Sequence, residues 1–154
     1  MTARPTELMV HVECVLPAPR ALIFELHSDP DQLAKWWGPR GFSTPSIVVD
    51  VRVGGQYRIA MQPPVGDSFF LTGEFRCVEP PAQLSYTFRY EEPDADDQET
   101  VVDFALRDDG ASTVVSIDQG PFLTEARRAL HTQGWTETLD RLYELVMSRH
   151  SSGD

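Results

Sequence analysis

The residues best able to do chemistry lie near the C-terminus, in a stretch with helical periodicity. His131 precedes Trp135 by four residues, so on a helix both side chains project from the same side. An imidazole titrates near neutral pH and can act as a general acid or base or orient a ligand carbonyl. Tyr86 is the second candidate for holding or moving a proton. The alternative for His131 is a structural histidine that hydrogen-bonds a neighbouring strand, because one histidine alone does not make an active site.

Other kinds of reaction lack their characteristic residues. The chain contains no serine or cysteine nucleophile motif, and His11, His27 and His150 do not show metal-ligand spacing. The acidic run EEPDADDQE at 91–99 lacks the spacing and the glycine of an EF-hand loop, so we expect a solvated hairpin tip there. We therefore expect no metal and no cofactor.

Length and charge restrict the class of protein. The chain has 154 residues, with 13 Lys and Arg against 24 Asp and Glu and a formal net charge of −11. This size predicts one domain over residues 1–154, and the acidic surface disfavours nucleic acid and anionic membranes because it repels phosphates. Neither a membrane span nor a signal peptide is evident, so we expect a cytoplasmic protein. Cys14 and Cys77 lie in apolar, strand-like runs and are expected to be buried thiols, not a disulfide.

The hydrophobic periodicity predicts the elements that must position these residues. A strand over 8–16 is followed by two short helices within 20–37, and a helical period over 124–148 predicts one long closing helix. Between them, turn signals separate six further strands, at 47–53, 56–62, 68–78, 83–90, 100–106 and 113–118. We expect order over about 7–148 and a flexible tail at 149–154.

This order of elements predicts an α+β fold. A twisted antiparallel sheet has one large apolar face, and only the last helix is long enough to cover it. Six hairpin-linked strands must curve around that helix, and a curved sheet against a straight helix leaves space. Such spaces are where ligands bind.

Four stretches carry a resemblance to a known family: WWGPRGFS at 36–43, DVRVGGQYR at 50–58, GEFRCVEPPAQLSYTF at 73–88 and HTQGWTETLDRL at 131–142. In this order they resemble the activator of heat-shock-protein-90 ATPase C-terminal-domain-like family, in the START-like, polyketide-cyclase-related (SRPBCC) superfamily. The resemblance implies a helix-grip fold, in which a curved seven-stranded antiparallel sheet encloses the C-terminal helix around an elongated pocket. Members of the superfamily bind lipids, steroids, polyketides or plant hormones, and some are cyclases.

The leading hypothesis for function is therefore a binding module for a hydrophobic or amphipathic small molecule, held between the sheet and the last helix. The residues expected to line the pocket are Trp37, Tyr57, Met61, Phe69, Tyr86, Phe88, His131, Trp135 and Leu139.

Two other functions remain open. The first is a cyclase or hydratase acting on a ring-bearing substrate, in which His131 or Tyr86 moves a proton. The second is a chaperone cofactor or stress-response protein that binds a protein partner through the Trp36-Trp37-Gly38-Pro39 corner. The eukaryotic chaperone activator carries a further N-terminal domain that we do not expect here, which weakens the second alternative. A homodimer, paired through a strand edge or a helix, is also compatible with the sequence.

Overall fold

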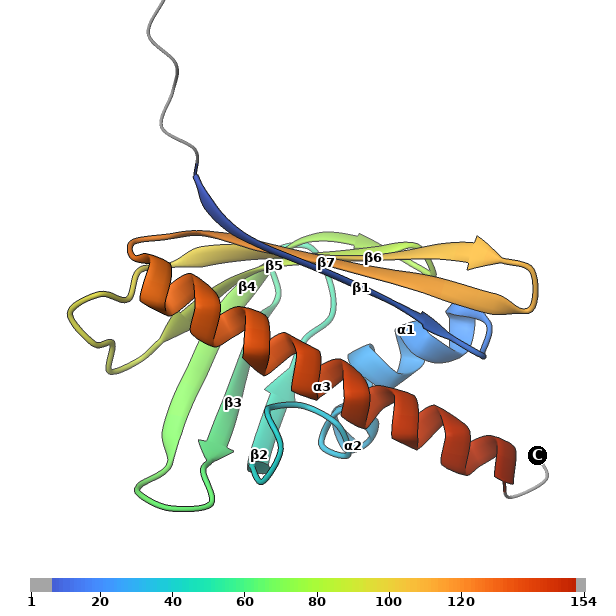
Figure 1. Cartoon of the computed structure of the whole chain (residues 1–154), viewed down its shortest axis with the longest axis horizontal. Helices are drawn as coiled ribbons and strands as arrows, with labels where there is room; N and C mark the ends of the chain where they lie inside the picture. The colour runs from blue at the N-terminus through green and yellow to red at the C-terminus, as the bar shows by residue number, and fades with distance from the viewer. Residues whose placement is uncertain (1–6, 152–154) are drawn as a thin grey trace, which may run out of the picture.

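The structure is a computed structural model that describes residues 7–151, and its main feature is a curved sheet crossed on one face by a long helix (Figure 1). The strands are β1 (Leu8–Leu16), β2 (Ser43–Val49), β3 (Gln56–Gln62), β4 (Phe69–Glu79), β5 (Gln83–Tyr90), β6 (Thr100–Asp109) and β7 (Ser112–Phe122). The helices are α1 (Arg20–Ser28), α2 (Pro30–Leu33) and α3 (Glu125–Ser151).

All seven strands form one antiparallel sheet in the order β1-β7-β6-β5-β4-β3-β2. The β1 strand pairs with β7, the last strand before α3, so the two ends of the chain meet at one edge of the sheet. Both short helices lie between β1 and β2 in the chain. The predicted α+β helix-grip architecture, with seven strands and a long C-terminal helix, is confirmed.

The largest shift in element boundaries is in β2, which spans Ser43–Val49 and not the predicted 47–53. Its pairing with β3 ends at Val49 opposite Tyr57, and residues 50–55 form a loop that docks on β4. In that loop the Gly54 N–H donates to the carbonyl of Phe75 over 2.9 Å. A side chain at Gly55 would place its Cβ 2.0 Å from the Asp50 carbonyl oxygen, so only glycine fits there. The Gly54-Gly55 pair therefore belongs to a docked turn that spans residues 50–55.

The last helix also runs further than predicted. It continues to Ser151, beyond the expected boundary at 148, and the remainder of the predicted flexible tail, 152–154, lies outside the described residues. Cys14 and Cys77 are free thiols, so the expected lack of a disulfide between them is confirmed, but each is partly rather than fully buried.

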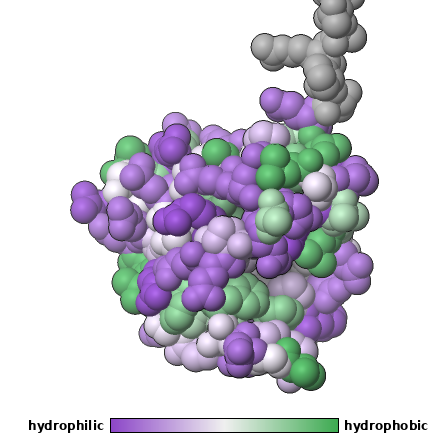
Figure 2. All heavy atoms as spheres, turned by 90° about the vertical axis from the view of Figure 1, so that its left-hand side faces the viewer, coloured by the Kyte–Doolittle hydropathy of each residue, from purple (hydrophilic) through white to green (hydrophobic). Residues whose placement is uncertain are grey.

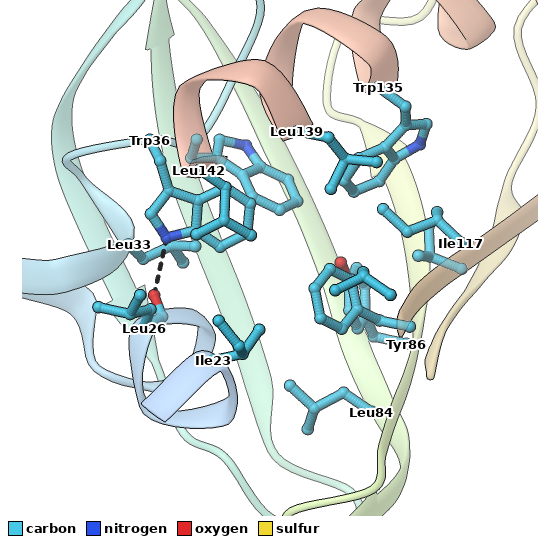
Figure 3. Packing of buried hydrophobic residues seen from close by; sticks show 14 of the residues in the cluster. Ile23, Leu26, Leu33, Trp36, Leu84, Tyr86, Ile117, Trp135, Leu139 and Leu142 are labelled. Carbon is cyan, nitrogen blue, oxygen red and sulfur yellow. Dashed lines mark hydrogen bonds between the residues drawn. The ribbon is translucent and has the colours of Figure 1, made fainter. Parts of the chain in front are cut away.

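The core is built where α1, the segment after α2 and the sheet meet (Figure 3). Trp36 is fully buried, and its indole N–H donates to the Leu26 carbonyl of α1 over 2.9 Å. Trp37 beside it is only 4% exposed. The corner expected to present these two indoles to a protein partner therefore buries both of them.

Helix α3 is joined to the sheet by a buried polar chain. The Trp135 indole N–H donates to Gln119 Oε1 on β7 over 2.7 Å, and Gln119 Nε2 donates to Thr100 Oγ1 over 2.9 Å. Leu139 and Leu142 continue the buried face of the helix towards its C-terminus. Because buried polar groups need partners, this series of hydrogen bonds sets the position of α3 on the sheet.

Candidate ligand cavity

A cavity of about 500 Å³ opens between the first half of α3 and the sheet. That volume is typical of a small-molecule site. The wall is mainly apolar and aromatic, with side chains from the segment after α2, from β3 to β5 and from α3: Trp37, Phe42, Met61, Phe69, Leu71, Phe88, Tyr90, Leu130 and Trp135. Figure 2 looks onto this end of the molecule, at the left of Figure 1, where hydrophilic residues border a green, hydrophobic area.

The structure brings most of the residues proposed for the pocket to this cavity. Six of the nine line it: Trp37, Met61, Phe69, Phe88, His131 and Trp135. Tyr57 and Tyr86 instead border a second cavity of about 10 Å³, which has room for a single water molecule. Leu139 is 5% exposed and lines neither cavity.

The three tyrosines of this region differ in what their hydroxyls contact. The Tyr57 hydroxyl donates to the Thr87 carbonyl over 2.6 Å, and the Tyr86 hydroxyl shares a 2.9 Å hydrogen bond with His27 Nε2. The Tyr90 hydroxyl has no hydrogen bond to any residue between 7 and 151, although its ring lines the large cavity. Burial raises the pKa of Tyr90 above its ordinary value, so its hydroxyl is a neutral donor and acceptor. Of these three tyrosines, Tyr90 is therefore the one whose hydroxyl is available to hydrogen-bond a ligand.

His131 faces the cavity from α3 among aromatic rings. Its ring centroid lies 4.8 Å from that of Phe122, 5.6 Å from that of Phe88 and 6.1 Å from that of Tyr90. Burial lowers the pKa of His131 to about 4, so the imidazole is neutral at neutral pH. Within the described part of the chain its ring nitrogens have no hydrogen bond, and the bond to a strand considered as the structural alternative is not formed. The imidazole thus offers one donor and one acceptor to the cavity.

The mouth of the cavity carries a charge cluster that the sequence analysis missed. Arg127 donates from Nε to Asp96 over 2.9 Å, lies within 3.3 Å of Asp97 through Nη1, and pairs with Asp94 through Nη2. The Thr124 hydroxyl also donates to Asp96, over 3.1 Å. The 91–99 segment is, as predicted, the mostly exposed loop of the β5–β6 hairpin, but its aspartates also dock it on the start of α3. Local sequence patterns could not predict this cluster, because Arg127 lies about thirty residues away from its aspartate partners in the chain.

His27 is a second residue whose position the sequence analysis did not predict. It is 5% exposed, its ring lies 4.5 Å from that of Phe104, and its Nδ1 is enclosed without a hydrogen bond. Burial lowers its pKa to about 4. Its burial could have been predicted from its spacing of four residues from Ile23, which places it on the buried face of α1.

Between residues 7 and 151 no three His, Cys, Asp or Glu side chains are grouped closely enough to hold a metal ion. Over the same residues, no helix has both the length and the apolar composition that crossing a membrane requires.

Comparison with known proteins gives a consistent relationship. The family described as "Activator of Hsp90 ATPase homolog 1-like protein" matches residues 17–147. Protein CV1439 from Chromobacterium violaceum is 26% identical, with a TM-score of 0.81 over 90% of this chain and 96% of that chain. Protein NE0264 from Nitrosomonas europaea is 25% identical, with a TM-score of 0.80 over 96% of this chain and 99% of that one. The AHSA1 (SPO3351) protein from Silicibacter pomeroyi, at 23% identity, shares the fold with a TM-score of 0.80 over 92% and 99% of the two chains. Comparison with curated proteins found no match. Because the family match spans most of the chain, this protein belongs to the Activator of Hsp90 ATPase homolog 1-like family.

Proposed function

We propose that this protein binds a hydrophobic or amphipathic small molecule in the cavity between the sheet and α3. The observation that carries the proposal is the cavity itself, about 500 Å³ in volume and walled mainly by aromatic and aliphatic side chains. Proteins of this family commonly bind hydrophobic ligands, which agrees with the proposal.

The polar groups of the cavity support a binding role. Tyr90 and His131 lie side by side on the wall, and neither has a hydrogen bond to another described residue. An apolar wall with a few converging polar groups orients a ligand through hydrogen bonds and holds it through burial of apolar surface.

The enzyme alternative, a cyclase or hydratase, has less support. With a pKa of about 4, the His131 imidazole is a weak general base at neutral pH, and no carboxylate among residues 7–151 orients it by a hydrogen bond. The Tyr86 hydroxyl is engaged by His27 and does not border the large cavity.

A protein partner at the Trp36–Trp37 corner has less support still, because both indoles are buried. A homodimer stays a prediction, and the outer strands β1 and β2 are the edges at which a second copy could pair.

A matched pair of substitutions on α3 tests the binding proposal. Thr138 is 4% exposed and lines the cavity, whereas Thr136 is exposed and does not. We expect Thr138→Phe to fill part of the cavity and to weaken binding of N-phenyl-1-naphthylamine, a neutral fluorescent probe, about tenfold, or about 1.4 kcal/mol. Thr136→Phe adds the same ring on the outer face and should leave the affinity unchanged.

Probe fluorescence is titrated for the wild type and both variants, and native mass spectra of gently purified wild type are compared with its denatured mass. A discrete added mass that is lost on unfolding would support the proposal and begin to identify the ligand. If the probe does not bind the wild type, or binds all three proteins equally while Thr138→Phe remains folded, the proposal is overturned.

A further inference from the structure

We propose that the cavity selects a cationic amphiphile, with an apolar body among the aromatic walls and a protonated amine at the mouth. This inference rests on the proposed function and adds to it the charge of the ligand.

The ionisable side chains that line the mouth are almost all acidic. Glu92, Asp94, Asp97 and Glu137 border the opening, and Arg127 is the one cation that borders it in the part of the chain described. His131 is neutral at neutral pH. The mouth therefore has a net negative charge.

Arg127 is not free to bind an anionic head group. Each of its three guanidinium nitrogens lies against a different carboxylate, those of Asp94, Asp96 and Asp97. A ligand carboxylate would have to displace one of these groups while being repelled by the other two. The single positive charge at the mouth thus gives no anchor for a fatty acid or another anion.

Glu92 is the carboxylate best able to receive an ammonium group. Its side chain is exposed, borders the cavity and has no hydrogen bond or ion pair to any residue in the 7–151 range. Glu137, by contrast, accepts from the backbone N–H of Arg40 over 3.1 Å and from Gln133 Nε2 over 3.0 Å. An amine can pair with Glu92 without breaking an existing contact.

The groups inside the mouth are compatible with a cation. Faces of aromatic rings attract ammonium groups, and Trp37, Phe88 and Trp135 line the cavity. The unpartnered Tyr90 oxygen and the neutral His131 ring can each accept an N–H bond. The net charge of −11 adds a long-range field that attracts cations to the protein and repels anions.

The test uses three ligands with the same alkyl chain and different heads: decylamine, decanol and decanoate. Each displaces N-phenyl-1-naphthylamine at pH 7 and low salt, below its micelle concentration. We expect decylamine to bind at least about tenfold more tightly than decanoate, with decanol between them, because charges at a protein surface interact over several ångströms. Raising the ionic strength should reduce the difference in affinity between decylamine and decanoate, because salt screens charge interactions.

Glu92→Gln removes the unpaired charge with little change in shape. We expect it to reduce the preference for decylamine over decanoate about threefold or more. Glu25→Gln is the matched control, since Glu25 is exposed on α1 and lies outside the cavity wall. It should leave all three affinities unchanged.

The outcomes separate this inference from the proposed function. If decanol and the probe bind but decylamine and decanoate bind equally, or decanoate binds more tightly, the inference is overturned and the cavity remains a binding site. An equal effect of Glu92→Gln and Glu25→Gln would also overturn it, since the preference would then come from net charge alone. If none of the ligands binds, the proposed function itself is wrong.

Discussion

The three tyrosines near the cavity allow a direct test of which polar group is available to a ligand. Replacing tyrosine with phenylalanine removes one hydroxyl and little else. Tyr57→Phe removes the donor to the Thr87 carbonyl, and Tyr86→Phe removes the partner of His27. Tyr90→Phe removes a hydroxyl that has no hydrogen bond to residues 7–151. We therefore expect the first two variants to lose stability and the third to keep it.

The expected loss of stability in each variant depends on the buried polar group that loses its hydrogen-bond partner. A buried polar group that loses its hydrogen bond costs roughly 1–3 kcal/mol in unfolding free energy. Tyr86→Phe should lie at the upper end of this range, because His27 Nδ1 already lacks a partner and the imidazole would then have none on either nitrogen. Tyr90→Phe should stay within about 0.5 kcal/mol of the wild type. Because a chain of this length loses about 2–4 °C in melting temperature per kcal/mol, the two groups of variants are resolvable.

Urea unfolding, followed by circular dichroism, measures the three differences, and equal slopes against urea show that the same surface is exposed in each case. The probe titration is then repeated with Tyr90→Phe and a ligand that carries a hydrogen-bonding head group. We expect weaker binding without loss of stability. If Tyr90→Phe were as destabilising as Tyr86→Phe, its hydroxyl would have an internal partner, and the reasoning that leaves it for a ligand would be refuted.

Three further predictions concern two glycines and the dependence of stability on pH. Gly73→Ala should destabilise the protein by about 1–3 kcal/mol or more, because its Cβ would lie 1.9 Å from the Thr87 carbonyl oxygen. Gly134→Ala should instead stabilise it by about 0.4–1 kcal/mol, because alanine favours the helix and the nearest atom to its Cβ outside the surrounding helix backbone is a Pro39 carbon at 3.7 Å. Urea unfolding of the two variants measures both effects. A loss of stability in Gly134→Ala would contradict this account. Burial lowers the pKa of both His27 and His131 from 6.5 to about 4, so between these pH values the unfolded chain binds more protons than the native one. The unfolding free energy should thus be complete above about pH 6.5 and should fall as the pH drops from there towards 4, by at most about 1.4 kcal/mol per pH unit for each histidine. Unfolding at pH 7, 6 and 5 measures the slope; His131→Gln should reduce it, and a flat profile would show that the histidines are not shielded from water.

Much of the fold could be predicted because it follows from local patterns. Alternation along 83–90 puts Tyr86, Phe88 and Tyr90 on one face of β5, and the spacing of four residues predicts His131 and Trp135 on one side of α3. In the structure the two α3 residues do line the same cavity, as does Phe88. The order of strands and helices likewise follows from turn residues and from the change of hydrophobic period at the last helix.

The order of the elements and the face on which most side chains lie thus follow from the amino-acid sequence alone, because neighbouring residues share one local geometry. How deeply each side chain on a face is buried depends instead on how distant elements pack together. Tyr86 and Tyr90 share a face of β5, yet one is enclosed by His27 and the other borders the cavity, because the curved sheet meets the helix differently along its length. The same holds for Arg127, whose partners Asp94 and Asp96 come from a distant loop. No periodicity encodes such pairings, since they depend on how α3 crosses the sheet.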